Sequence, residues 1–182
     1  MGEAINLVNN FKIEKVILNC GEINELEQEL IKILIKKQIP YYSCINEIDI
    51  EDIKLYFLND QIYDNENDNS NVIYVNLNGI SLLLMGDAGK EVEKAIIEKY
   101  NLKNIDILKV GHHGSKTSSS KQFIESIDHI YSIISVGRNN RYNHPNNEVL
   151  EILKNTQIYR TDLNGSIIVT LKNKKINIKT CI

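Results

Sequence analysis

The amino-acid sequence predicts one α/β domain, in which strands and helices alternate along the chain and pack in layers. Strand-length apolar runs alternate with segments whose apolar residues recur at the 3/4 spacing of a helix face. The composition is 42% hydrophobic and 25% charged, which is typical of a globular protein. A chain of 182 residues is long enough for one ordinary domain and short for two, so we expect a single domain over residues 1–182.

Helices are predicted where apolar residues share one face and a turn residue ends the pattern. In residues 22–37 the side chains of Ile23, Leu26, Leu30 and Leu34 form one stripe, and Pro40 follows the last turn. Similar patterns predict helices over residues 3–11, 89–100, 120–127 and 146–154.

Strands are predicted from short apolar runs bounded by turn residues. The clearest pair covers residues 72–77 and 80–85, because Asn78-Gly79 between them is the strongest short hairpin signal. Further strands are expected at residues 15–18, 41–44, 54–58, 105–110, 130–136, 157–160, 165–171 and 175–179.

Composition also excludes a membrane-spanning chain. The longest apolar run, residues 80–85, is far shorter than the ~18–20 residues that cross a bilayer. The first residues lack the basic and apolar parts of a secretory signal. Three cysteines form no Cys-x-x-Cys pair, which favours reduced thiols. We therefore expect a soluble, cytoplasmic domain that makes no contact with lipid.

Charge is distributed unevenly along the chain. Residues 1–100 carry 18 acidic and 9 basic side chains (net −9), whereas residues 101–182 carry 6 acidic and 12 basic ones (net +6). A basic second half is typical of proteins that bind phosphate or a polyanion. Uneven partition of ordinary surface charge explains the pattern equally well.

Candidate metal-binding and catalytic residues follow two of the predicted strands. Asp87 comes just after one strand, where α/β proteins place functional groups, although it could instead cap the following helix. His112 and His113 lie between glycines after another strand, and neutral imidazole is a common ligand of Zn or Mn. Because adjacent side chains of extended backbone point in opposite directions, we expect one histidine to bind metal and the other either to contact substrate or to orient a metal-binding residue.

Candidate substrate-binding residues are predicted in the loops. The segment 137–145 contains Asn140, Arg141 and His144, whose side chains suit phosphate oxygens or a stacked base. Asp162 lies in a turn and could be no more than its cap. Two further candidates follow the double histidine, namely Ser115 and Lys116.

These motifs, in this order, resemble one protein family. The segments that carry the resemblance are Asn69-Ser-Asn-Val72, Leu82-Leu-Leu-Met-Gly-Asp87, Leu108-Lys-Val-Gly-His-His-Gly-Ser-Lys-Thr-Ser118, Ile134-Ser-Val-Gly137, Asn140-Arg-Tyr142 with His144-Pro145, and Tyr159-Arg-Thr-Asp162. They are similar to the metallo-β-lactamase-like domain of the bacterial competence DNA-uptake family ComEC and its free-standing relatives. The resemblance implies an αβ/βα sandwich and a hydrolase, usually proposed to be a nuclease on DNA. It also implies two Zn or Mn ions, with Asp87 as the bridging carboxylate and one of the two histidines as a late ligand.

The chain departs from the family pattern at the main metal-binding element. The family's His-x-His-x-Asp-His run, its variants and the opening strands are absent from the sequence. We therefore expect an incomplete domain whose N-terminal half, or a membrane-channel portion, belongs to a parent protein. With two or three ligands where such a site needs about five, the chain should bind metal weakly and turn over slowly or not at all.

Three functions remain open at the level of sequence. The first is a metal-dependent phosphodiesterase that acts on single- or double-stranded DNA. The second is a non-catalytic DNA-binding or assembly module, possessing the basic motifs without the metal run. The third is a hydrolase of a small ester or lactam, because this fold hosts many such enzymes.

Overall fold

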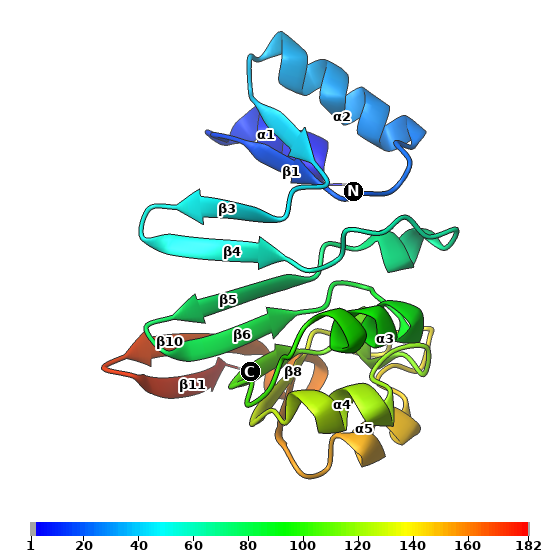
Figure 1. Ribbon diagram of the computed structural model, residues 1–182, viewed down its shortest axis with the longest axis vertical. Coiled ribbons are helices and arrows are strands. Elements are labelled where there is room, and N and C mark those ends of the chain that lie inside the picture. Colours follow the sequence, from blue (N-terminus) through cyan, green and yellow to red (C-terminus); the bar gives the residue numbers. More distant parts are fainter. Residues whose placement is uncertain (1–2, 182) are drawn as a thin grey trace.

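The computed structural model describes residues 3–181 and confirms a mixed α/β fold built on one large sheet. The sheet has seven strands in the order β3-β4-β5-β6-β7-β8-β9 (Figure 1). Their bounds are β3 (Glu47–Ile50), β4 (Ile53–Phe57), β5 (Ile73–Leu77), β6 (Ile80–Leu84), β7 (Ile107–Lys109), β8 (Tyr131–Ile134) and β9 (Gln157–Arg160). Neighbours from β3 to β6 are antiparallel, and neighbours from β6 to β9 are parallel.

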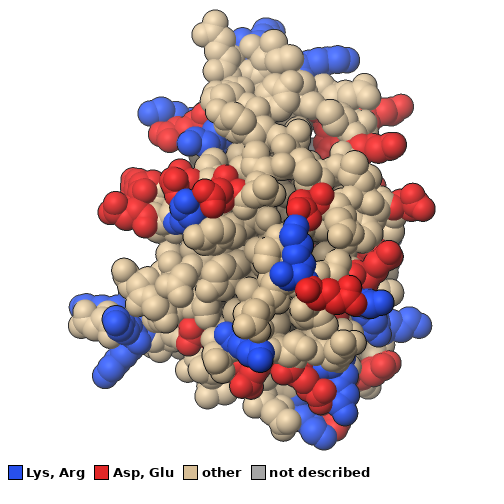
Figure 2. Space-filling view, viewed as in Figure 1, with Lys and Arg blue, Asp and Glu red and all other residues tan. Residues whose placement is uncertain are grey.

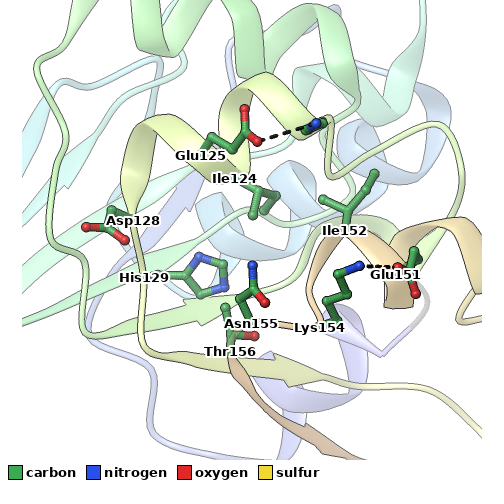
Figure 3. A pocket seen from close by; sticks show the side chains of 10 residues that line it. Ile124, Glu125, Asp128, His129, Glu151, Ile152, Lys154, Asn155 and Thr156 are labelled. Atoms are coloured by element: carbon green, nitrogen blue, oxygen red, sulfur yellow. Dashed lines mark hydrogen bonds and ion pairs between the residues drawn. The ribbon is translucent and has the colours of Figure 1, made fainter.

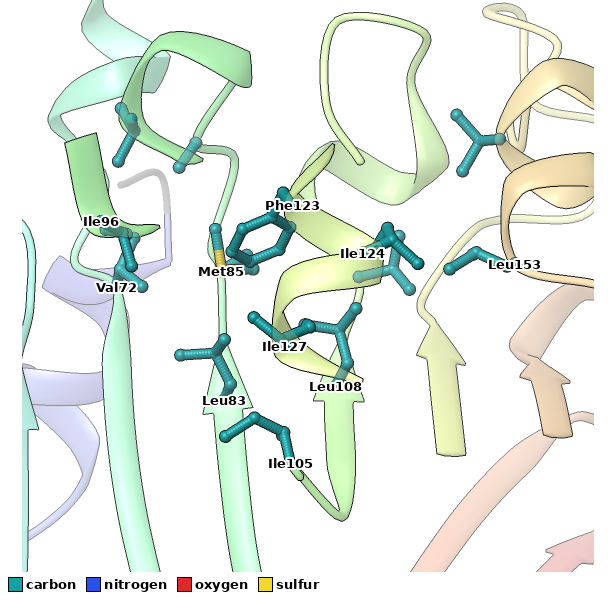
Figure 4. Close-up of a cluster of buried hydrophobic side chains, with 14 of the residues drawn as sticks. Val72, Leu83, Met85, Ile96, Ile105, Leu108, Phe123, Ile124, Ile127 and Leu153 are labelled. Carbon is teal, nitrogen blue, oxygen red and sulfur yellow. The ribbon is translucent and has the colours of Figure 1, made fainter. Parts of the chain in front are cut away.

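Helices connect the parallel strands and cover one face of the sheet (Figure 1). They are α3 (Lys90–Lys99), α4 (Lys121–Ile127) and α5 (Asn147–Ile152). Each parallel connection needs such a crossover, because a tight turn can join only antiparallel strands. The helices bury the main core against the sheet, with Leu83, Leu108, Phe123 and Ile127 at most 1% exposed (Figure 4).

The opposite face of the sheet is less completely covered. Val75 and Ile107 on this face are buried, whereas Leu82, Leu84 and Ile133 are half-buried. One further pair, β10 (Ser166–Lys172) and β11 (Lys175–Cys181), forms a separate antiparallel sheet on the side away from the helices (Figure 1). A short helix, α6 (Thr161–Asn164), joins β9 to β10 where the sequence predicts a turn.

The N-terminal segment packs around a second, smaller core. It contains α1 (Ala4–Asn10), α2 (Glu25–Lys36) and the parallel pair β1 (Val16–Leu18) and β2 (Tyr41–Ser43). The stripe predicted for α2 supplies Leu30 and Leu34 to this core, which also contains Val8 and Leu18. The prediction is wrong for Leu26, which is exposed, and for Ile23, which is exposed and precedes the helix. Asn24 and Glu27 begin α2 with a capping box, in which each side chain binds the other's backbone N–H.

The prediction of three reduced thiols is wrong, because Cys20 and Cys44 form a disulfide. Their Cα atoms lie 4.3 Å apart although 24 residues separate them in the sequence. The reason is the β1–β2 pairing, since Leu18 and Ser43 are register partners and each cysteine follows closely. Cys181 is exposed and free. Disulfides persist in oxidising compartments, so the cysteines no longer support a cytoplasmic location.

Most predicted elements are confirmed, and the differences have local causes. The hairpin at Asn78-Gly79 is present, with positive φ at both residues. Strand β3 was not predicted, because its sequence Glu-Ile-Asp-Ile is short and half acidic. Within residues 3–181, no helix combines the length and apolar character needed to cross a membrane.

Candidate functional site

The sequence-predicted site residues lie at the carboxyl ends of the parallel strands. Asp87 follows β6, the Gly111–Gly114 turn follows β7, the 137–146 loop follows β8, and Asp162 follows β9. Because these strands run in the same direction and are neighbours, the four loops meet at one edge of the sheet.

Asp87 does not cap the helix that follows it. The N-cap of α3 is Gly89, and its N–H donates instead to the buried carboxylate of Asp68 at 2.7 Å. Asp68 lies in the short 3-10 helix η1 (Glu66–Asn69), 21 residues earlier in the sequence. The helix is therefore capped by a distant residue, and the Asp87 carboxylate is free to serve another purpose.

The double-histidine turn has left-handed backbone instead of the extended backbone we expected. The φ angles are +44° at His112, +55° at His113 and +79° at Gly114. The two imidazole rings are 6.3 Å apart and nearly perpendicular. His113 faces Asp87, with its Nε2 3.8 Å from the Asp87 Oδ1, whereas His112 contacts Thr117 and lies beside His144.

The hydrogen bond made by the Nδ1 of His113 determines which ring nitrogen carries the proton. Its Nδ1 lies 2.7 Å from the backbone carbonyl of Ser135, which can only accept, so Nδ1 carries the proton. In the neutral ring Nε2 is then an unprotonated acceptor that faces a carboxylate oxygen. Two acceptors in this arrangement are suited to a shared proton or a cation, and histidine ligands of metals are commonly oriented by such a carbonyl.

The 137–146 loop arranges its aromatic side chains in a row beside the histidines. The ring of His144 is 5.9 Å from that of His112 and stacks at 5.8 Å on Tyr142. The guanidinium of Arg141 lies 4.8 Å above the Tyr142 ring. Burial, and then the nearby His112 and His113, lowers the pKa of His144. This row ends at the imidazole that faces Asp87.

Three of the predicted substrate-binding residues already use their polar side-chain atoms in hydrogen bonds within the protein. Asn140 donates to the carbonyls of Gly137 and His144 and accepts from the His144 N–H, so its amide closes the loop. Ser115 is 5% exposed and its hydroxyl binds Thr117. Both carboxylate oxygens of Asp162 accept from Arg160, and this pairing lowers the pKa of Asp162. The polar side-chain atoms of these three residues therefore already have partners within the chain, and their role in substrate binding stays a prediction.

Two predicted residues remain accessible. Lys116 is exposed on the turn after the double histidine, and Arg141 is exposed on the outer side of the aromatic row. Both can reach an anionic ligand without losing a buried partner.

Lys109 is a site residue that sequence reasoning missed. It is the last residue of β7, where its register partners are Leu84 on β6 and Ile133 on β8. Among the described residues, its side-chain Nζ makes one hydrogen bond, a long one of 3.3 Å to the Val110 carbonyl. Burial lowers its pKa, and the negative charge of Asp87 opposes that effect. The signal in the sequence that could have identified Lys109 is a lysine inside an otherwise apolar predicted strand.

A complete metal site is not present among the described residues. Asp87 and His113 are suitable donors, but no group of three or more His, Cys, Asp and Glu side chains in residues 3–181 could hold an ion. Two ions with a bridging carboxylate need more ligands than this pair supplies. The described residues alone therefore do not fit the two-metal site that the family resemblance implies.

The structure therefore combines one large mixed sheet, helices on one face of that sheet and an Asp–His pair at the strand ends. Comparison of the sequence with known proteins shows which proteins the chain is similar to. The chain is 32% identical over 181 residues to ComE operon protein 3 of Bacillus subtilis, covering 96% of this chain and 23% of that protein. The chain is therefore similar to one part of this protein, and it spans less than a quarter of the length of the curated relatives it matches.

Other relatives are similar to shorter parts of the chain. Identity is 36% over 106 residues with competence protein ComA of Neisseria gonorrhoeae, covering 56% of this chain and 15% of that protein. The sequence identity is 35% over 116 residues with recombination protein 2 of Haemophilus influenzae, and this match covers 63% of this chain and 14% of that protein. No family model matches the chain. A putative Zn-dependent hydrolase of the metallo-β-lactamase superfamily from Thermotoga maritima aligns with a TM-score of 0.43 and 12% identity, over 80% of this chain and 82% of that one.

Proposed function

We propose that this domain is the phosphodiester-binding part of a metal-dependent nuclease that acts on DNA during competence. The observation that carries the proposal is the pair formed by Asp87 and His113, with His113 oriented by the Ser135 carbonyl. The names of two relatives refer to competence and to recombination, processes in which DNA is handled. Further metal ligands would come from polypeptide outside residues 3–181.

The residues of this chain would bind and orient the substrate. His113 presents its unprotonated Nε2 beside the Asp87 carboxylate, and together they can hold one cation or one proton. A bound divalent cation would supply charge neutralisation for the phosphate. The ammonium of Lys109 and the exposed guanidinium of Arg141 would bind phosphate oxygens.

The surface charge supports an anionic partner for the second half of the chain. On the face in Figure 2, acidic side chains gather around the β3–β4 hairpin, and basic side chains gather at the tip of β10–β11. The corresponding counts are net −9 for residues 1–100 and net +6 for residues 101–182. Such segregation favours a polyanion that approaches the basic end.

The first test is metal binding by the isolated chain. Titration calorimetry with Mn²⁺ and Zn²⁺ should show weak binding of no more than one ion, and Asp87→Asn or His113→Gln should weaken it by about tenfold or more. Asp49→Asn, which removes an exposed carboxylate on β3, is the matched control. Tight binding of two ions per chain would contradict the incomplete site, and equal binding by all variants would contradict the Asp87–His113 assignment.

A second candidate function is DNA binding without catalysis. It is favoured by the absence of a three-ligand group in residues 3–181. A panel of linear duplex, single-stranded DNA, a chromogenic lactam and a phosphodiester ester separates the alternatives. Binding without cleavage at saturating Mn²⁺ would support the second candidate, and cleavage of the lactam alone would exclude both DNA functions.

Replacing Lys109 by methionine should weaken binding of a short oligonucleotide by about tenfold, because one charge-assisted contact to phosphate is lost. Methionine retains the apolar stem that packs between Leu84 and Ile133. Fluorescence anisotropy at fixed ionic strength measures the change. Lys103→Met removes an exposed lysine before the other end of β7 and serves as control. An equal loss in both variants would show general charge attraction and no role for Lys109.

A further inference from the structure

The β10–β11 hairpin has one half-buried face and one face that is open to solvent. Successive side chains of a strand point to opposite faces, and the exposure of the hairpin residues alternates accordingly. The half-buried face is aliphatic and consists of Ile167, Val169, Leu171, Ile176 and Ile178. The open face consists of three pairs of register partners, Lys172–Lys175, Thr170–Asn177 and Ile168–Lys179.

The charge of this hairpin has a single sign. Residues 163–181 contain no aspartate or glutamate and four lysines, which are Lys172, Lys174, Lys175 and Lys179. All four are exposed, and none forms an ion pair with another residue in the range 3–181. Protection of an open strand edge against pairing can use charges of either sign, so it does not explain why every charge here is positive.

Two other lysines of the second half of the chain show the ordinary surface pattern. Lys121 lies 3.6 Å from Glu125, and Lys154 pairs with Glu151 (Figure 3). Both pairs line the cavity that His129 also borders. There each positive charge is balanced by a neighbouring carboxylate, whereas the charge of the hairpin is left for an anion from outside the described chain.

The tip of the hairpin is built at a cost in stability. Lys172 and Lys175 are register partners, and like charges directly opposite each other destabilise a strand pair. The turn between them has φ of +51° at Asn173 and +58° at Lys174. The other two-residue turn of this kind has Asn78-Gly79, and glycine is the residue that such backbone favours. A lysine in that position therefore points to a role other than folding.

The length and composition of the open face favour duplex DNA as its partner. Seven residues of strand span about 20 Å, which is roughly six base pairs of B-DNA. Single strands are commonly held by aromatic side chains that stack on bases, and residues 166–181 contain none. A membrane surface is commonly bound through large apolar side chains beside the charges, and within residues 166–181 only Ile168 is both large, apolar and exposed.

We propose that the open face of the β10–β11 hairpin binds the phosphate backbone of duplex DNA without reading its sequence. Lys172, Lys174 and Lys175 bind phosphates at the tip, and Lys179 binds a phosphate about 14 Å further along β11. The tip lies toward the end of the sheet that holds the β5–β6 turn, whereas the Asp87–His113 pair lies at the other end (Figure 1). The inference rests on the proposed function for the choice of DNA, but the contact itself needs no metal ion.

A triple variant of the hairpin tip tests this proposal. Lys172→Gln, Lys174→Gln and Lys175→Gln together should weaken binding of a duplex of about 20 base pairs by about tenfold or more. The slope of log affinity against log salt concentration should fall by about 2 to 3, because three phosphate contacts are lost. Fluorescence anisotropy in EDTA measures both quantities without metal-dependent cleavage. The unmodified chain should bind the duplex more tightly than a single strand of equal length.

The matched control removes the same charge from the N-terminal segment. Lys32→Gln, Lys36→Gln and Lys37→Gln replace three exposed lysines at α2, and this variant should bind the duplex within about twofold of the unmodified chain. An equal loss of affinity in the two triple variants would show general charge attraction and overturn the proposal.

The single variant Lys174→Gly separates binding from folding. Glycine suits the left-handed backbone and removes one positive charge from the tip, so the free energy of unfolding should stay equal or rise. Duplex binding should nevertheless weaken by about threefold. A variant that binds the duplex as tightly as the unmodified chain would contradict a role for Lys174.

Two further outcomes identify another partner or another failure. Tighter binding to phosphatidylserine vesicles than to the duplex, lost in the hairpin variant, would identify a lipid surface and overturn the proposal. Failure of the proposed function is recognised separately, because that function is tested by metal binding at Asp87 and His113. Duplex binding that depends on the hairpin in a chain that binds no ion would contradict the nuclease alone. Metal binding with an unaffected hairpin variant would contradict the hairpin surface alone.

Discussion

Replacing Gly114 by alanine should lower the free energy of unfolding by about 3 kcal/mol. A Cβ at this position would lie 2.6 Å from the Cβ of Pro145, which is closer than real contacts allow, and 3.2 Å from its Cα, which is a tight contact. The φ of +79° adds backbone strain for any residue with a side chain. The N–H of Asn146 also donates to the Gly114 carbonyl at 2.8 Å, so the two loops cannot separate without losing that bond.

Gly79→Ala is the matched control for this variant. Its φ is +90°, but a Cβ there would meet nothing within 4 Å, so it should cost only the conformational term of about 1 kcal/mol. Urea denaturation of both variants measures the difference. Equal losses would show that the contact with Pro145 relaxes freely and that the loops at the candidate site are not packed as described.

Acidification from pH 6.5 to pH 4 should remove up to about 3 kcal/mol of stability through His129 alone. The pKa of His129 is about 4 in the folded protein and 6.5 for an unperturbed histidine. Between these values the unfolded chain binds a proton that the folded protein does not, so stability falls as the pH falls. The loss begins near pH 6.5 and is complete near pH 4.

The variant His129→Gln isolates this contribution, because it has no titrating ring. Unfolding by urea at several values between pH 4 and pH 7 should show a shallower slope for the variant. Burial raises the pKa of Glu93, which acts in the opposite direction, but that contribution is common to both proteins and cancels in the difference. Identical slopes would mean that His129 titrates normally and is not buried in solution.

The sequence predicted those parts of the structure that depend on residues close together in the chain. The 3/4 spacing of Leu26, Leu30 and Leu34 predicted α2, and Asn78-Gly79 predicted the β5–β6 hairpin. The positions of Asp87 and the double histidine after apolar strands predicted that they meet at one sheet edge, and the structure places His113 beside Asp87. These features follow from local periodicity and from the rule that parallel strands end together.

Contacts between residues that are distant in the sequence decided the cap of α3 and the partners of the polar site residues. Asp68 caps α3 from 21 residues away, which releases Asp87 from the capping role that its position also allowed. Asn140 and Asp162 bear the right chemistry for a ligand, but neighbours in the folded chain use their polar atoms.

By itself, the sequence determined the layered α/β class, the order of the elements and the motifs that resemble the ComEC family. Only the tertiary structure decided that Cys20 pairs with Cys44 and which histidine faces Asp87. Periodicity records which side of an element is buried, and it carries no information on which partner a polar atom finds. That partner is set by strand register and loop conformation, which exist only once the chain has folded.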